Sequence, residues 1–244
     1  MERPCDVFPP EKINAKLWTH INFAFALVGN DNRIAAMNSY DAALYPRVTG
    51  LKAHNPALKV FIAVGGWAAG GASFSRMVAT PASRATFISS ALSFMKTYGF
   101  DGIDIDWEYP MALDREGNPD DAANLVTFCR ELRAALGSSY GITLTLPSSY
   151  CKMPISQPGA WSISDDTRVS TRFRCGGHGT LSGLGTSLCP AYPQINPNLL
   201  QQYNFMSYDI HGTWDGNSPY TQAIVQPHTN LTGKSRRFVS MFSC

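Results

Sequence analysis

The sequence has few charged residues and no cluster of charge of either sign. Lys, Arg, Asp and Glu make up 16% of the 244 residues, and the formal net charge is +2. Binding to nucleic acid or to an anionic membrane surface requires a basic stripe or patch, and none occurs here. We therefore expect neither nucleic acid nor a membrane as a partner.

Long apolar stretches and zinc-type cysteine spacings are also missing. No apolar run reaches the roughly 20 residues that a membrane-spanning helix needs. The polar start, Met1 to Asp6, contains no apolar signal core, so the chain as given shows no route into a secretory pathway. Six cysteines occur without Cys-x-x-Cys or Cys/His spacing, which argues against a zinc site and leaves any disulfide pairing unspecified.

Strand-like and helix-like segments alternate through the first two-thirds of the chain. Apolar runs predict strands buried on both faces at 19–28 and 59–67, further strands at 100–107 and 141–146, and a fifth at 203–209. Alternation of this kind is typical of a parallel sheet with right-handed helical crossovers.

Capping signals mark the helices between these strands. Thr80-Pro81 predicts the start of a helix that ends at Gly99, and Asn118-Pro119 predicts the start of one that ends at Gly137. Residues 44–51 predict an earlier helix, because Leu44, Val48 and Leu51 fall on one stripe.

Two segments lack any such pattern. Residues 151–198 are rich in Ser, Gly, Thr and Pro and predict an irregular insert, and the basic tail at 233–244 resembles nothing before it. A structureless stretch as long as the insert is unusual inside a compact domain. We therefore expect one partial domain over 1–244 that carries an irregular insert at 151–198 and an aberrant tail at 233–244.

The strand at 100–107 ends in a row of acids. Side chains alternate faces along a strand, so Asp104, Asp106 and Glu108 share one face, and the other face carries Ile103, Ile105 and Trp107. Buried, like-charged carboxylates raise one another's pKa, which can keep Glu108 protonated near neutral pH as a general acid requires. A solvated acidic edge fits poorly, because the intervening positions are apolar. A site for a divalent metal is the other alternative, and we favour acid catalysis over it.

These acids resemble the Asp-x-x-Asp-x-Asp-x-Glu signature of glycoside hydrolase family 18, the chitinases, with Asp101 in first place and Glu108 in last. Residues 63–67 resemble the family's Ser-x-Gly-Gly segment, with Ala63 where serine is common, and 206–209 resemble its Met-x-Tyr-Asp segment. The opening Arg-Pro-Cys-Asp and residues 208–215 are most similar to the killer-toxin-like chitinases of fungi.

The resemblance implies an α/β fold, the TIM (β/α)8 barrel, whose chemistry lies at the carboxyl ends of the strands. About five of its eight strands are recognisable here, so we expect an incomplete barrel, truncated at both ends. It also implies an extracellular, monomeric enzyme that acts on chitin or chito-oligosaccharides without a metal or cofactor.

The family mechanism supplies the expected site residues. The substrate's own acetamide is the nucleophile, and Glu108 protonates the glycosidic oxygen. Asp106 orients the acetamide, Asp104 shares a proton with Asp106, and Tyr208 donates to the acetamide oxygen. The other expected residues contribute to substrate binding: Trp67, Tyr109, Met206, Asp209, Trp214, Gly65 and Gly66. Asp101 is the structural member of the signature.

Two other functions compete with a chitinase. The first is a catalytically inactive, lectin-like chitin-binding relative, and the second is a non-functional fragment. The acids Asp106 and Glu108 argue against the lectin, because such relatives usually lose the acid.

Overall fold

The computed structural model describes residues 8–147, 199–200, 202–206 and 208. The chain divides into two compact units, one of residues 1–144 and 198–202 and the other of residues 145–197 and 203–244. The predicted insert at 151–198 and the predicted tail at 233–244 lie outside the described residues.

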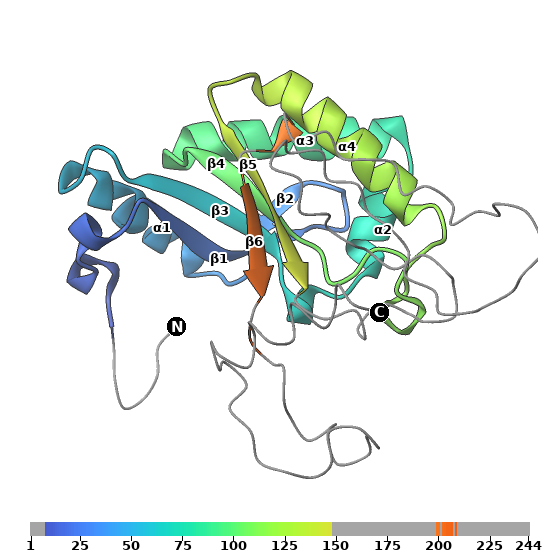
Figure 1. The fold of residues 1–244 in the computed structure, drawn as a ribbon, viewed down its shortest axis with the longest axis horizontal. Coiled ribbons are helices and arrows are strands. Elements are labelled where there is room, and N and C mark those ends of the chain that lie inside the picture. The colour runs from blue at the N-terminus through green and yellow to red at the C-terminus, as the bar shows by residue number, and fades with distance from the viewer. Residues whose placement is uncertain (1–7, 148–198, 201, 207, 209–244) are drawn as a thin grey trace, which may run out of the picture. The chain divides into compact units, whose positions relative to one another are not determined.

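The described strands form one sheet with the order β2-β1-β3-β4-β5-β6 (Figure 1). Strands β1, β3, β4 and β5 pair in parallel, and β2 is antiparallel to β1. All five expected strands are present, whereas the short strand β2 was not predicted. The strands are β1 His20–Val28, β2 Ile34–Ala36, β3 Lys59–Gly65, β4 Gly102–Asp106, β5 Gly141–Pro147 and β6 Gln202–Met206. The expected α/β architecture with a parallel sheet is confirmed, and the sheet is open over the described residues.

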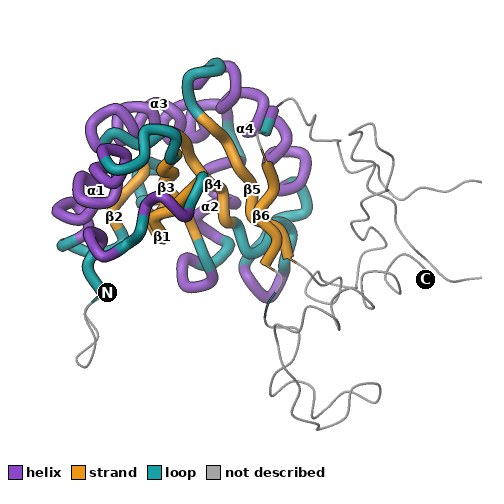
Figure 2. Tube along the Cα trace, turned by 60° about the vertical axis from the view of Figure 1, so that its left-hand side comes forward, coloured by secondary structure: helices purple, strands orange, loops and turns teal. Residues whose placement is uncertain are grey.

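The helices lie along the outside of the strands (Figure 2). Helix α3 packs against α1, α2 and α4. Between the strands, the chain also forms short 3₁₀ turns, of which Trp67–Ala69 and Leu113–Arg115 follow the carboxyl ends of β3 and β4. The helices are α1 Asp41–Thr49, α2 Ala72–Val78, α3 Pro81–Tyr98 and α4 Asp121–Leu136.

Helix α3 begins and ends where its sequence predicts. The side chain of Thr80 accepts a hydrogen bond from the N–H of Ser83, and the hydroxyl of Ser83 accepts one from the N–H of Thr80, which makes a reciprocal capping box. Pro81 occupies the first helical position, and Gly99 ends the helix in the left-handed conformation.

The predicted start of α4 was wrong by two residues. The carboxylate of Asp121 accepts a hydrogen bond from the N–H of Asn118 at 2.7 Å, and the side chain of Asn118 accepts one from the N–H of Asp120 at 3.1 Å. These bonds hold 118–120 in a turn, so the helix begins at Asp121 instead of at Pro119. The predicted end at Gly137 is confirmed.

The prediction that the first strand is buried on both faces was also wrong. Within β1 only Ala26 and Val28 are buried. Strand β2 pairs only with the three residues from Ala26 to Val28, so the amino-terminal part of β1 has a single strand neighbour, β3, among the described residues. By contrast, β3 is buried at every position after Lys59.

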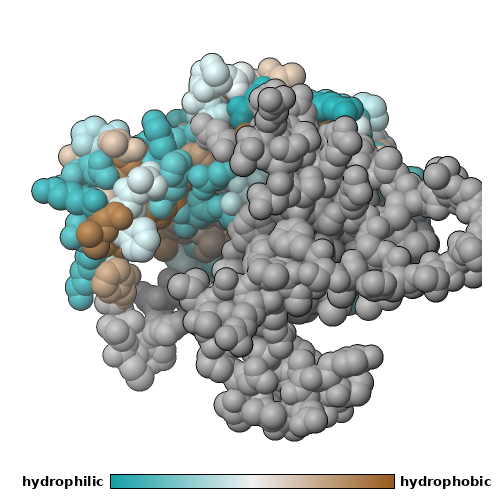
Figure 3. All heavy atoms as spheres, in the orientation of Figure 1, coloured by the Kyte–Doolittle hydropathy of each residue, from teal (hydrophilic) through white to brown (hydrophobic). Residues whose placement is uncertain are grey.

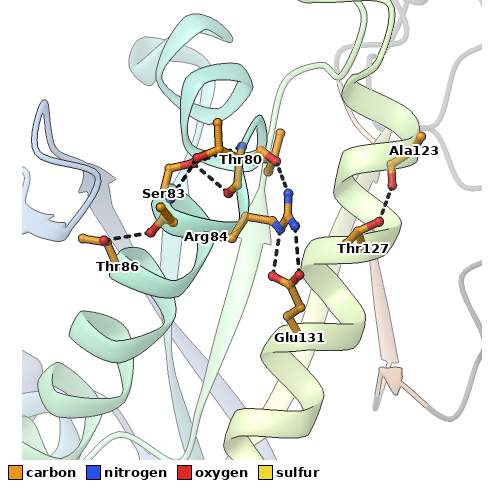
Figure 4. Close-up of polar contacts among 9 residues, drawn as sticks. Thr80, Ser83, Arg84, Thr86, Ala123, Thr127 and Glu131 are labelled. Atoms are coloured by element: carbon orange, nitrogen blue, oxygen red, sulfur yellow. Dashed lines mark hydrogen bonds and ion pairs between the residues drawn. The ribbon is translucent and has the colours of Figure 1, made fainter.

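An ion pair between a buried arginine and a partly exposed glutamate joins the helices on the outside of the sheet (Figure 4). The guanidinium of Arg84 on α3 donates from Nε and Nη2 to the two carboxylate oxygens of Glu131 on α4, at 2.7 and 2.9 Å. Its Nη1 donates to the carbonyl oxygen of Val78 at the end of α2. Arg84 is 5% exposed, so one side chain fixes three helices to one another.

The coloured surface in Figure 3 is mostly hydrophilic and has a few hydrophobic spots. Large apolar side chains that the described residues expose include Phe8, Leu17 and Trp18. Among the described helices, none combines the length and the apolar character that crossing a membrane requires.

Candidate active site

The expected row of acids lies at the carboxyl end of β4 and is buried. Asp104, Asp106 and Glu108 are 2%, 6% and 8% exposed. Trp107 stacks on the ring of Phe74 in α2, with 5.3 Å between the ring centroids, so this face of the strand points toward the helices. By alternation Asp104 and Asp106 lie on the opposite face of the sheet.

Asp106 is the member of the row whose proton affinity is clearly changed. Burial, followed by repulsion from the charges of Glu108 and Asp104, raises the pKa of Asp106 from 3.8 to about 7. Its Oδ1 atom is buried and has no hydrogen-bond partner among the described residues. The raised pKa of the row thus falls on Asp106, whereas the sequence predicts a raised pKa for Glu108.

Asp104 has a hydrogen-bond partner that was not predicted from the sequence. The hydroxyl of Thr143 on β5 donates to Asp104 Oδ1 at 2.6 Å. The two residues are direct neighbours in the register of β4 and β5. The alternation of Thr143 with Ile142 and Leu144 could have indicated its face, but not that β5 would pair beside β4 in this register.

The glycine pair at the carboxyl end of β3, Gly65 and Gly66, allows β3 and β4 to approach closely. Gly65 has φ +117°, and a Cβ added there would lie 2.1 Å from the carbonyl oxygen of Asp106. At Gly66, where φ is +80°, an added Cβ would contact the ring of Phe25 at 2.8 Å. The pair therefore has a packing reason to be glycine, quite apart from any contact with substrate.

Trp67 follows this turn and has a cation over its ring. The side chain is 54% exposed, and the guanidinium carbon of Arg115 lies 3.9 Å from the ring centroid. Arg115 also donates through Nε to the carbonyl oxygen of Glu108 at 3.3 Å and through Nη2 to the carbonyl oxygen of Trp67. One arginine thus joins the segments that follow β3 and β4.

The loop after Glu108 is held by a buried carboxylate at the start of α4. Asp121 is fully buried and accepts hydrogen bonds from the hydroxyl of Ser75 at 2.6 Å and from the N–H of Met111 at 3.1 Å, besides that of Asn118. Asp121 and Arg115 could not be predicted from local sequence patterns, because both act through contacts between segments that are distant in the sequence.

Asp101 lies at the amino end of β4, at the opposite end of the strand from Glu108. Its carboxylate accepts hydrogen bonds from the N–H of Val60 at 2.8 Å and from Nζ of Lys52 at 3.0 and 3.1 Å. Its carbonyl oxygen accepts a bond from the N–H of Gly141. Asp101 therefore ties β4 to both neighbouring strands.

The remaining expected residues fall in different parts of the chain. Tyr109 is 5% exposed, which leaves little of its ring surface free for stacking on a sugar. Met206 and Tyr208 belong to the second unit, and Tyr208 is 50% exposed. Asp209 and Trp214 lie outside the described residues.

The acids of the described residues include no group of three ligands arranged to hold a metal ion. What the arrangement does provide is a set of closely spaced, buried carboxyl groups, one of which binds a proton near pH 7. Such groups can donate and accept protons in a reaction at neutral pH.

Comparison with known proteins decides the family. The sequence model described as glycosyl hydrolases family 18 matches residues 3–243. The chain belongs to this family. It is 32% identical to "Probable chitinase 2" of Drosophila melanogaster over 89% of this chain and 39% of that protein. It is 35% identical to "Probable endochitinase" of Caenorhabditis elegans over 85% of this chain and 30% of that protein.

The family 18 fold is also supported by solved structures. The immunomodulatory active chitinase of Trichuris suis superposes with a TM-score of 0.63 at 28% identity, over 96% of this chain and 57% of that one. The chain thus spans under two-fifths of the length of these two curated relatives and a little over half of this solved chain.

Proposed function

We propose that this chain is an endochitinase-type glycoside hydrolase that cleaves β-1,4 linkages between N-acetylglucosamine units of chitin and its oligosaccharides. The observation that carries the proposal is the buried row of Asp104, Asp106 and Glu108 at a strand end, in a chain of family 18. A row that includes a carboxyl group with a pKa of about 7 suits proton transfer at neutral pH.

In the proposed mechanism the substrate supplies its own nucleophile. Glu108 protonates the glycosidic oxygen as the bond to the anomeric carbon breaks. The carbonyl oxygen of the 2-acetamido group attacks that carbon and forms an oxazolinium ion, while Asp106 orients the acetamide N–H and stabilises the positive charge. Glu108 then takes a proton from a water molecule, whose oxygen attacks the anomeric carbon and opens the oxazolinium ring. The configuration at the anomeric carbon is retained.

The other residues are proposed to hold the sugar. Tyr208 donates a hydrogen bond to the acetamide oxygen, and Asp209 supports the distorted ring. Trp67 is proposed as a stacking surface because its ring is half exposed at a strand end, and Trp214 is proposed for the same role from the sequence alone. The proposed reaction needs neither a metal nor a cofactor.

Two finer assignments rest on sequence resemblance. We propose that the enzyme is closest to the killer-toxin-like chitinases of fungi, on the strength of the motifs at 3–6 and 208–215. An extracellular, monomeric enzyme is proposed with it.

The test is the dependence of cleavage on the acetyl group. We expect turnover of the hexamer of N-acetylglucosamine and no turnover of the hexamer of glucosamine, which has the same linkages but lacks the carbonyl oxygen that attacks. Equal cleavage of both would refute the substrate-assisted mechanism. Binding of the acetylated hexamer without any cleavage would instead favour the lectin-like relative.

A further inference from the structure

Asp104 has a neighbour on each side in the sheet, and only one of the two can donate a hydrogen bond from its side chain. Ala63 of β3 and Thr143 of β5 both lie opposite Asp104 in the parallel register. The hydroxyl of Thr143 donates to Asp104 Oδ1 at 2.6 Å, and the exposed fractions of the two residues are 1% and 2%.

A donated hydrogen bond favours the charged form of a carboxylate. At 2.6 Å the bond from Thr143 has the short length typical of a hydroxyl that donates to a carboxylate anion. The effect is strong here because both groups are shielded from water, where electrostatic interactions are weakly screened. Thr143 therefore stabilises a negative charge on Asp104.

Asp106, the next acid on the same face, lacks such a donor on its buried Oδ1 among the described residues. Burial and the charges of Glu108 and Asp104 raise the pKa of Asp106 to about 7. Both carboxyl groups are buried, so the difference between them is the hydroxyl of Thr143, which donates to Asp104 and not to the buried Oδ1 of Asp106.

We propose that Thr143 is a positioning residue that keeps Asp104 ionised and thereby places the proton of the row on Asp106, beside Glu108. A proton on Asp106 lies next to Glu108, the acid that protonates the glycosidic oxygen. A proton on Asp104 would lie two residues further from Glu108 along the strand. The effect of Thr143 on catalysis rests on the proposed function, whereas its effect on the position of the proton does not.

The strand segments that pair with β4 contain no ionisable side chain that could take the proton of the row. These segments are residues 61–65 of β3 and 141–144 of β5. Asp101 lies at the far end of β4 and is paired with Lys52. The cation Arg115 contacts Glu108 through its carbonyl oxygen. Within the described residues, Asp106 and Glu108 are therefore the titratable groups that share a face with Asp104.

Three substitutions test the proposal. Thr143→Val keeps the shape of the side chain and removes the hydroxyl, while Thr143→Ser retains a hydroxyl. The matched control is Thr49→Val, which removes another buried hydroxyl, one that donates to the carbonyl oxygen of Tyr98 at 2.8 Å in the helical layer. Carbon-13 NMR follows the titration of the Asp106 carboxyl carbon, whose signal is assigned by its loss in Asp106→Asn. The kinetic constants for the N-acetylglucosamine hexamer are measured in parallel across pH.

In Thr143→Val we expect the proton to move to Asp104, so the titration midpoint of Asp106 falls by about one pH unit or more. The value of kcat at pH 7 should fall about tenfold while KM stays within about twofold, because Thr143 is buried behind Asp104. Thr143→Ser should restore both the midpoint and kcat, and Thr49→Val should change neither.

An unchanged Asp106 midpoint in folded Thr143→Val would overturn the proposal, whatever the rate. So would a loss of rate that Thr143→Ser does not restore, because it would assign Thr143 to packing. If Thr143→Val does not fold, Asp104→Asn decides: it removes the charge that Thr143 stabilises and should lower the Asp106 midpoint in the same way. A wild-type chain that cleaves no hexamer would refute the proposed function, while the NMR titration would still decide the position of the proton.

Discussion

The N–H of Gly66 donates a hydrogen bond to the carbonyl oxygen of Asp106 at 2.9 Å. This bond ties the turn after β3 to the last residue of β4, two residues before Glu108. A main-chain hydrogen bond, independent of any side chain, therefore joins the segments that carry Trp67 and Glu108. The geometry of the candidate site depends on how closely these two strand ends can approach.

Replacement of Gly65 by alanine should disrupt this approach. The new Cβ would lie 2.1 Å from the Asp106 carbonyl oxygen and 2.8 Å from the ring of Phe74. We expect Gly65→Ala to lower the free energy of unfolding by about 3 kcal/mol or more, from strain at positive φ together with overpacking. Gly70→Ala is the matched control, because Gly70 has φ +70° but an added Cβ meets nothing within 4 Å. Urea denaturation should show a loss of only about 1–2 kcal/mol there. Equal losses for both variants would contradict the packing argument.

The raised pKa of Asp106 predicts how stability depends on pH. The folded state binds this proton up to about pH 7, and the unfolded state releases it near the ordinary value of 3.8. Between these values the folded state holds more protons, so the free energy of unfolding should fall as pH rises from 4 to 8, by up to about 4 kcal/mol from this group.

Urea denaturation at pH 5 and pH 8 measures this dependence. Asp106→Asn, which cannot ionise, should lose less stability than the wild type between the two pH values. An identical pH dependence for the two proteins would mean that Asp106 titrates normally in the folded state.

Arg115 should affect substrate binding more than the chemical step. Its guanidinium lies over the Trp67 ring and donates to main-chain oxygens on both sides of the site, so it fixes the orientation of the ring. We expect Arg115→Met to raise KM for the N-acetylglucosamine hexamer about 3- to 10-fold, which corresponds to loss of roughly 1 kcal/mol of cation–π and positioning energy. The value of kcat should change less. Arg130→Met, at an exposed position of α4, is the control. A fall in kcat with KM unchanged would place Arg115 in the chemistry instead.

The ion pair between Arg84 and Glu131 should be important for stability. Glu131→Gln leaves a buried guanidinium without its counter-charge, and we expect a loss of about 1–3 kcal/mol in the free energy of unfolding, reduced from the fully buried case because Glu131 is 38% exposed. Glu11→Gln breaks a pair of the same geometry between Glu11 and Arg47, where both side chains are well exposed. It should change stability far less. Similar losses for the two variants would show that burial does not set the strength of the pair.

Local sequence signals predicted most of the fold, because each signal acts within a few residues. The capping box at Thr80 and the glycine at 99 set the ends of α3, and the alternation from 103 to 108 separates the buried acids from the face that packs on helices. The family motif then predicted the strand end at which the acids lie.

What the sequence did not predict depends on contacts between distant segments. Strand β2 is three residues long and exists because it pairs with β1. Asp121 moves the start of α4 because it binds main-chain groups of the preceding loop as well as Ser75 of α2. The bond from Thr143 to Asp104 depends on which strand pairs beside β4 and in which register.

The central claim is that Glu108 is the acid of a chitinase, and replacement of Glu108 by glutamine tests it most directly. Glutamine keeps the shape of the side chain and removes the proton that it donates. Release of N-acetylglucosamine oligomers from the hexamer should fall by about 10³-fold or more, while calorimetry should show that the hexamer still binds. Turnover in Glu108→Gln equal to that of the wild-type chain would contradict the account.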